Sequence, residues 1–196
     1  MFTRQTMTDT IDNKNEKQLL CRMQKGEAEA SRMVYNQYVR YLCAIASRYI
    51  TDEEDVKDVL QESFLKIFSS IGTFVYRGPG SLKGWMARIT LNETLKHLKK
   101  SNKLNFTEWD DNGIDMPDEE PETEDIPASD IYRMIRALPN GYRTIFNLYV
   151  IDGKSHKEIA KLLSIKESSS ASQLHRAKAL LADKIKQYRN NKCVSI

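Results

Sequence analysis

An acidic segment with three of the chain's five prolines in and beside it divides this sequence near its middle. Residues 108–125 hold ten acidic side chains and no lysine or arginine. A segment with so much charge and so few aliphatic side chains buries too little apolar surface to offset the entropy lost on ordering. We therefore expect residues 105–128 to form a flexible acidic linker between two separately folded parts of the chain.

On both sides of this linker, apolar residues recur at three- and four-residue steps, the spacing of helices that bury one face. One predicted stripe comprises Met33, Val34, Tyr38, Tyr41, Leu42 and Ile45. Strand-like alternation persists nowhere in the sequence. We predict an all-α chain with two small helical domains, at residues 16–104 and 129–190. A disordered N-terminus (residues 1–15) and a C-terminal tail (residues 191–196) would flank them.

The net charge of +3 conceals a strong segregation of charge. Residues 1–107 carry 17 basic and 12 acidic side chains, and residues 130–196 carry 13 basic and five acidic ones. Two basic parts that flank an acidic linker suit the binding of a polyanion by both. Ordinary solvated helix faces would explain the same charges, so charge alone does not decide the function.

No motif in the sequence points to an enzyme. The three cysteines are far apart, and the three histidines lack the spacing of metal ligands. A glycine-rich phosphate loop and a nucleophile elbow are also absent from the sequence. We therefore predict no catalytic residue, no metal and no cofactor. The polar N-terminus and the lack of a long apolar run favour a cytoplasmic protein without membrane insertion.

Residues 155–177 have the pattern of a helix-turn-helix. Ser155 and Glu158 form the signature of a capping box that opens the first helix. Ser164 and Ile165 are expected to make the turn. The predicted buried positions of the two helices are Ile159, Leu162, Leu163, Leu174, Ala177 and Leu181.

This stripe leaves a polar set on the outer face of the second helix: Ser169, Ser172, His175 and Arg176, with Gln173 to one side. Short hydroxyls would let the start of that helix enter the DNA major groove, where serine and arginine can bond base edges. The simpler alternative is that the serines only cap a helix. Lys166 occupies the cap position and Ser170 falls on the buried side, so we expect a helix start less stable than average.

Residues 137–181, "ALPNGYRTIFNLYVIDGKSHKEIAKLLSIKESSSASQLHRAKALL", resemble region 4 of bacterial RNA polymerase sigma factors. The resemblance is to the extracytoplasmic-function (ECF) group of the sigma-70 family. The stretches "EDVKDVLQESFLKIF" and "GSLKGWMARITLNETLKHLKK" resemble region 2 of the same proteins. This implies that residues 16–104 bind core polymerase and open the minus-10 promoter element. Residues 129–190 would recognise the minus-35 element.

The resemblance implies core RNA polymerase as a partner, through the coiled coil of its largest subunit and through its flap. In the family the helix that contains "DVLQES" docks on the coiled coil, so the contacts would be Asp58, Gln61 and Glu62. These three lie at i, i+3 and i+4, on one polar face of a helix. An ordinary solvated face is the alternative. Promoter DNA and an inhibitory anti-sigma protein are the other implied partners.

For the minus-10 element, the resemblance implies contacts by Tyr76, Arg77, Asn92, Lys96, Lys99 and Lys100. Asn92 would contact a base, and the lysines would follow the phosphates of the opened strand. Trp85 matches a tryptophan typical of the family. Its apolar neighbours favour core packing over base stacking, and the same interpretation applies to Phe74.

For the minus-35 element, the resemblance implies base contacts by Ser172, His175 and Arg176, with Lys178 and Ser169 on phosphates. Ala171 and Gln173 stand where the family often has lysine or arginine. Fewer cations release fewer counterions, so the promoter preference of relatives does not transfer to this chain.

Two other classes of protein stay open from the sequence. A helix-turn-helix regulator would bind duplex DNA as a dimer without a stable polymerase complex, but it has no use for "DVLQES" beside a basic helix. A metal-dependent nuclease would need clustered carboxylates on a rigid scaffold, whereas the dense acidic cluster lies on the expected linker. The leading hypothesis is a promoter-specificity subunit that catalyses no covalent step.

Overall fold

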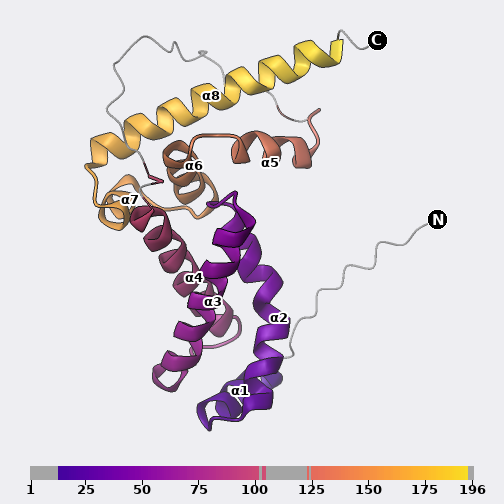
Figure 1. Cartoon of the computed structure of the whole chain (residues 1–196), viewed down its shortest axis with the longest axis vertical. Coiled ribbons are helices and arrows are strands. Elements are labelled where there is room, and N and C mark those ends of the chain that lie inside the picture. Colours follow the sequence, from indigo (N-terminus) through magenta and orange to yellow (C-terminus); the bar gives the residue numbers. More distant parts are fainter. Residues whose placement is uncertain (1–12, 102, 105–122, 124, 194–196) are drawn as a thin grey trace, which may run out of the picture. The chain divides into compact units, whose positions relative to one another are not determined.

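The computed structural model describes residues 13–101, 103, 104, 123 and 125–193 (Figure 1). These residues contain eight α-helices, a 3-10 turn (η1), a π-helical segment (η2) and no β-strand, so the predicted all-α fold is confirmed. The elements are α1 (Asn13–Gln24), α2 (Ala28–Ser47), α3 (Glu53–Ser70), η1 (Ile71–Thr73), α4 (Ser81–Lys100), α5 (Ala128–Arg136), α6 (Asn140–Phe146), η2 (Asn147–Ile151), α7 (His156–Leu163) and α8 (Glu167–Cys193). Most of the expected linker lies outside the described residues.

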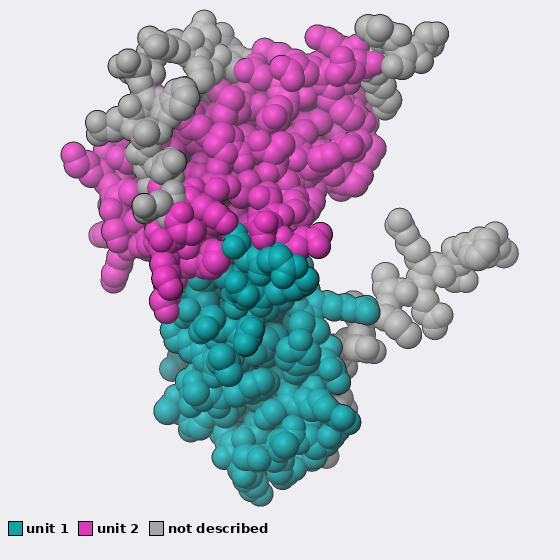
Figure 2. Space-filling view, in the orientation of Figure 1, with its two compact units in different colours: residues 1–46, 54–93 teal, residues 47–53, 94–196 magenta. Residues whose placement is uncertain are grey.

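The chain divides into two compact units, shown in separate colours in Figure 2. Unit 1 consists of residues 1–46 and 54–93, and unit 2 of residues 47–53 and 94–196. The domain limits expected from the sequence stay predictions. The helices do extend further than expected at both ends, because α1 begins at Asn13 and α8 continues to Cys193.

Unit 1 is held together by apolar side chains from all four of its α-helices. Full burial of one such side chain contributes about 1.5–3 kcal/mol relative to leaving it in water. Gly26 has a φ of +79° and makes the turn between α1 and α2, a conformation that other residues adopt only with strain. The buried set includes Leu19, Leu20, Met23, Val34, Tyr38, Leu42, Phe64, Ile67, Leu82 and Met86.

Two members of the apolar stripe predicted on α2 face solvent instead. Met33 is 40% exposed and Tyr41 is 37% exposed, so their predicted burial is wrong. Each precedes a buried residue by one position, which places it about 100° around the helix from the buried stripe. The Tyr41 ring lies 4.3 Å from the ammonium of Lys83. The buried residues of α2 are Ala30, Val34, Tyr38, Leu42, Ile45 and Ala46.

Unit 2 packs α5, α6 and α7 against the long helix α8 (Figure 1). The buried positions predicted for the helix-turn-helix are confirmed except for Leu162, which is only partly buried. Gly153 has a φ of +65° and turns the chain from η2 toward α7. The core of this unit includes Leu138, Ile145, Leu148, Ile159, Leu163, Leu174, Ala177, Leu181 and Ile185.

The helix α6 continues after Phe146 as the π-helical segment η2. The N–H of Asp152 donates to the carbonyl of Asn147 at 2.9 Å, an i to i+5 bond. The buried Asn147 side chain donates to the carbonyls of Arg143 and Arg48, both at 2.9 Å. Apolar residues that recur with the helical period of 3.6 positions do not reveal such a widened turn.

Arg143 joins α6 to the segments around it. The guanidinium is buried, with the residue 3% exposed. Burial and the nearby charge of Arg136 lower the pKa of Arg143 from its ordinary value. A buried charge is costly unless it is hydrogen-bonded. The acceptors around the Arg143 guanidinium therefore offset the cost of its burial. They are the carbonyls of Tyr49 (2.8 and 3.2 Å), Arg136 (2.9 Å) and Leu138 (2.9 Å) and Oδ1 of Asn140 (2.6 Å).

We predict that Arg143→Met destabilises unit 2 by about 2–5 kcal/mol, because it leaves several buried carbonyls without a donor. The measurement is the urea midpoint of the full chain, followed by circular dichroism. Arg133→Met is the control, since the Arg133 side chain is 75% exposed and pairs with Asp130 at the surface. It should change the free energy of unfolding by less than about 0.5 kcal/mol. Equal midpoints for the two variants would contradict the prediction.

Candidate nucleic-acid interface

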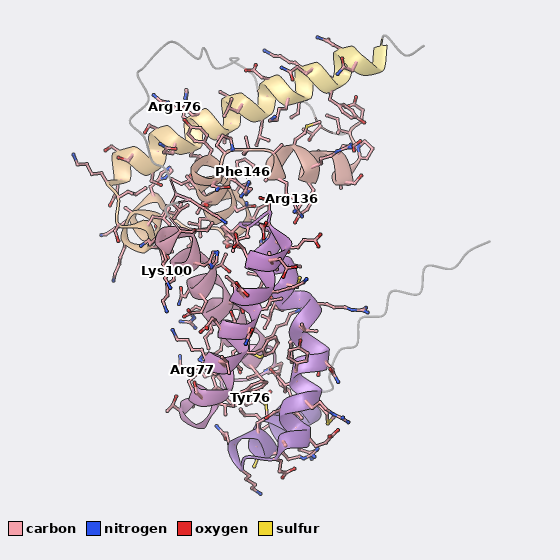
Figure 3. The ribbon with its side chains drawn as sticks, viewed as in Figure 1. Tyr76, Arg77, Lys100, Arg136, Phe146 and Arg176 are labelled. Atoms are coloured by element: carbon pink, nitrogen blue, oxygen red, sulfur yellow. The ribbon has the colours of Figure 1, made fainter. Side chains whose placement is uncertain are left out.

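The loop of residues 74–80, between η1 and α4, carries two of the predicted DNA contacts. Arg77 is exposed and Tyr76 is partly buried, and Figure 3 labels both near the end of α4 opposite Lys100. Gly78 and Gly80 have φ values of +119° and +76°, which L side chains rarely adopt. The backbone N–H of Arg77 donates to Ser81 Oγ at 3.2 Å. The loop therefore has a defined conformation and presents an arginine beside a helix start.

Phe74, the first residue of this loop, packs against Trp85 of α4. Their ring centroids are 4.9 Å apart, and both side chains are partly buried against the core of unit 1. This agrees with the core packing expected from the sequence. Substituting either ring would therefore weaken the unit.

The four residues predicted to follow the minus-10 strand on α4 are all exposed: Asn92, Lys96, Lys99 and Lys100. Lys99 already has partners within unit 2. Its ammonium donates to the carbonyl of Leu162 at 2.7 Å and to Ser164 Oγ at 3.3 Å. A cation is favourable at this end of α7, where carbonyl groups lack helical partners. The sequence does not reveal the contact, because its residues are 63 positions apart.

The residues predicted to contact polymerase lie together on α3. Asp58, Gln61 and Glu62 are exposed on one side of the helix. Leu65 follows Glu62 by three positions and is 58% exposed, so an apolar side chain continues this face. Leu65 is not among the predicted contacts, although its helical spacing from Gln61 and Glu62 is a usable signal in the sequence.

The helix-turn-helix begins with the capping box that the sequence predicts. Ser155 Oγ accepts a hydrogen bond from the N–H of Glu158 at 3.3 Å. In return, the Glu158 carboxylate accepts bonds from the N–H and the hydroxyl of Ser155, at 2.8 and 2.7 Å. Ser164 ends α7 in the left-handed conformation, with φ of 61°. The predicted cap and turn are both confirmed.

The outer face of α8 presents the predicted minus-35 set. Ser172 and His175 are exposed, and the remaining members are partly buried: Ser169, Arg176 and Lys178. Gln173 was expected to lie to one side of this exposed set, but this prediction is wrong because Gln173 is buried, at only 6% exposed. It follows the buried Ser170 by three positions and so shares the inner face of the helix. The polar surface of α8 is narrower than the sequence suggests.

Ser170 is fully buried, as predicted, and its hydroxyl has a partner there. It lies 3.0 Å from Nδ1 of His156, whose ring stacks on Tyr149 at 4.6 Å between centroids. A valine at this position would leave the imidazole nitrogen without its partner. The serine thus joins the start of α8 to the start of α7, a role that the sequence analysis did not find.

The described residues contain no group of three or more His, Cys, Asp or Glu side chains that could hold a metal ion. Among the same residues, no helix has the length and apolar character needed to cross a membrane.

Curated relatives of this chain are RNA polymerase sigma factors. The RNA polymerase sigma-H factor of Pseudomonas aeruginosa is 25% identical, over 86% of this chain and 92% of that protein. The ECF RNA polymerase sigma-E factor of Haemophilus influenzae is 26% identical, over 85% of this chain and 93% of that protein. A solved structure, CnrH in complex with the cytosolic domain of CnrY, has a TM-score of 0.47 and 19% identity, covering 87% of this chain and 97% of that one.

Two family models match in the order expected. The model for "Sigma-70 region 2" matches residues 34–104, and that for "Sigma-70, region 4" matches residues 128–181. The chain belongs to the sigma-70 family, in its ECF group. This sigma factor is therefore a promoter-specific transcription initiation factor. Region 2 contains α3, the loop of residues 74–80 and α4, region 4 contains the DNA-binding helix-turn-helix, and α1 precedes both matches.

The capping box makes a pH-dependent prediction for region 4. Hydrogen bonds from the backbone N–H and the hydroxyl of Ser155 hold the pKa of Glu158 below its ordinary value of 4.5. A depressed folded-state pKa stabilises the fold above the unfolded pKa, and this stability is lost as pH falls through the folded pKa. Glu158→Gln should therefore lower the urea midpoint at pH 7 and match the wild type in acid.

Glu167→Gln is the control for this titration, because Glu167 also lies in the first turn of a helix and is exposed. This substitution should lower the urea midpoint at pH 7 less than Glu158→Gln does. A wild-type advantage over Glu158→Gln that did not shrink as the pH fell from 7 into the acid range would contradict the prediction.

Proposed function

We propose that this sigma factor binds core RNA polymerase and directs it to two-part promoters, with region 4 on the minus-35 element and region 2 on the minus-10 element. The supporting observation is that one chain exposes both a polar face on α3 and a short-chain polar face at the start of α8. A DNA-binding module alone would need only the second. The covalent chemistry stays in polymerase, so the sigma factor itself catalyses no step and takes no cofactor.

The polymerase contact would be made by α3. Asp58 and Glu62 supply negative charge, Gln61 supplies both donor and acceptor groups, and Leu65 supplies an exposed apolar anchor beside them. Protein interfaces commonly combine a central apolar anchor with polar groups around it. The coiled coil of the largest polymerase subunit is the proposed partner. The polymerase flap is the proposed partner of region 4.

Opening of the minus-10 element would rely on the loop of residues 74–80 and on α4. Arg77 is exposed beside the helix start, and Asn92 and Lys96 continue along the helix. Cationic side chains that follow a strand and polar side chains that reach its bases are the usual means of holding single-stranded DNA. Lys99 would have to exchange its bonds to Leu162 and Ser164 for a phosphate.

Reading of the minus-35 element would rely on the outer face of α8. The short Ser172 side chain and His175 leave room for the helix start in the major groove, and Arg176 can form a two-pronged bond to guanine. Ser169 and Lys178 are the proposed phosphate contacts. Buried Ser170 and Gln173 hold the opposite side of the helix in place.

The second candidate is a helix-turn-helix regulator that binds duplex DNA without polymerase. Pull-down with purified core polymerase, followed by run-off transcription on a genomic library, decides between the two. A stable complex that starts transcription at specific sites supports the sigma function. DNA binding without a polymerase complex would overturn it. By family resemblance we also propose a cytoplasmic location and an inhibitory anti-sigma protein as a further partner.

We predict that the combined variant Asp58→Ala, Gln61→Ala and Glu62→Ala binds core polymerase at least tenfold more weakly, while its unfolding midpoint stays within error of the wild type. These side chains are exposed, so their removal leaves the core intact. The measurement is the affinity for core polymerase by fluorescence polarisation. Glu54→Ala is the control, because this carboxylate is 80% exposed on the same helix, where it pairs with surface Lys57. Equal affinity in all three proteins would exclude this face of α3.

We predict that Arg176→Ala weakens minus-35 binding by about 1–3 kcal/mol and relaxes selectivity at one base pair, as expected for a base contact. Lys178→Ala should weaken binding to every sequence alike and reduce the slope of log affinity against log salt by about one. Salt titrations on matched and mutated duplexes measure both effects. If the two variants behaved identically, the proposed division between base and phosphate contacts would be wrong.

A further inference from the structure

The start of α4 lacks a capping side chain of its own. The residue before Ser81 is Gly80, whose carbonyl accepts the bond from the N–H of Gly84 at 2.9 Å and so stands at the cap position. Its φ of +76° disfavours the serine or aspartate that usually caps a helix. The free N–H groups at this end of α4 must therefore find an acceptor elsewhere.

Glu16, on α1, supplies that acceptor. One carboxylate oxygen accepts the N–H of Gly80 at 3.0 Å, and the other accepts the N–H of Leu82 at 3.3 Å. The residue is only 4% exposed, so both bonds form away from bulk water. A carboxylate at the N-terminal end of a helix is also favoured by the helix dipole. The cap of α4 thus comes from 64 and 66 positions earlier in the chain.

The same carboxylate also reaches the loop of residues 74–80. Partial desolvation, the charge of Glu16 and a hydrogen bond to its carboxylate together raise the pKa of Tyr76. Tyr76, one of the predicted minus-10 contacts, is therefore turned toward Glu16. Its neighbour Arg77 stays exposed (Figure 3). One buried group consequently ties together the helix start and the loop.

The other end of α1 holds the beginning of this loop. The Gln24 amide donates to the carbonyl of Ile71 at 3.1 Å and to that of Phe74 at 3.0 Å. Between Gln24 and Glu16, the apolar side chains Leu19 and Met23 are buried in the core of unit 1. The helix α1 is therefore an anchored support that contacts the segment of residues 71–82 at both of its ends.

We propose that Glu16 is a positioning residue for promoter opening, which holds the loop of residues 74–80 and the start of α4 in the conformation that presents Arg77 to the opened minus-10 strand. This inference rests on the proposed function of region 2. Donors from Gly80, Leu82 and Tyr76 neutralise the carboxylate locally, which reconciles a buried negative charge with a surface that binds DNA. Glu16 lies outside the residues matched to region 2, which begin at position 34.

The test compares two DNA probes built on a promoter mapped by run-off transcription with this holoenzyme. One is a fork-junction DNA with a single-stranded minus-10 element, and the other is a duplex that carries only the minus-35 element. Glu16→Gln keeps the shape of the side chain but has one acceptor oxygen in place of two. We expect it to lower affinity for the fork-junction probe about tenfold, and to leave affinity for the minus-35 duplex and for core polymerase unchanged. A purely structural role would weaken all three together.

Two further variants complete the design. Tyr76→Phe removes only the phenol donor and should lower fork-junction affinity less than Glu16→Gln, with the double variant no weaker than Glu16→Gln alone, because both act through one contact. Glu29→Gln, at an exposed carboxylate of unit 1, is the matched control for loss of charge.

The outcomes separate this inference from the proposed function. Wild-type fork-junction affinity in both Glu16→Gln and Tyr76→Phe would overturn the positioning role, while the sigma function would stand. A wild-type holoenzyme that gained no affinity from the single-stranded minus-10 element would overturn the proposed function of region 2 itself. If Glu16→Gln failed to fold, Tyr76→Phe would decide, because it leaves the two helix-capping bonds in place: reduced fork-junction affinity would support the inference and wild-type affinity would overturn it.

Discussion

Backbone N–H groups at a helix start need an acceptor, and both proposed nucleic-acid modules of this sigma factor meet that need with a carboxylate. At α7 the carboxylate is Glu158, three residues into the helix, in a reciprocal pair with Ser155. At α4 it is Glu16, from a different helix. The orientation of each proposed DNA-contacting surface depends on these bonds, since a frayed start would release the residues beside it.

Three buried polar side chains connect elements of unit 2 through hydrogen bonds. Ser170 bonds His156 across the two helices of the helix-turn-helix, and Asn147 bonds carbonyls beside the π-helical segment. Arg143 collects carbonyls from several segments around α6. Because unpaired polar groups are costly in a core, these contacts specify the packing geometry more narrowly than apolar side chains would. Among the serines at the start of α8, Ser170 thus serves the internal packing of unit 2, whereas Ser172 belongs to the outer surface of the helix.

The features predicted correctly from the sequence are those decided by neighbouring residues. Helical periodicity, the capping box of Ser155 and Glu158 and the burial of Ser170 depend on spacings of three or four positions. Some of the features missed depend on partners far along the chain. Lys99 bonds the end of α7, and no local pattern predicts this contact. The capping role of Glu16 could not be predicted for the same reason, because its three donors lie about sixty positions further along the chain.

The two modules therefore differ in what their geometry depends on. The cap of α7 is local, so its capping bonds need no segment from elsewhere in the chain. The cap of α4 is supplied by α1, and α1 stays in place through Leu19, Leu20 and Met23 in the core of unit 1. Any change that loosens this packing also moves the carboxylate away from the loop that bears Arg77. In region 2, the stability of the core and the shape of the proposed strand-opening surface are consequently one coupled property, whereas in region 4 the cap of α7 involves only neighbouring residues.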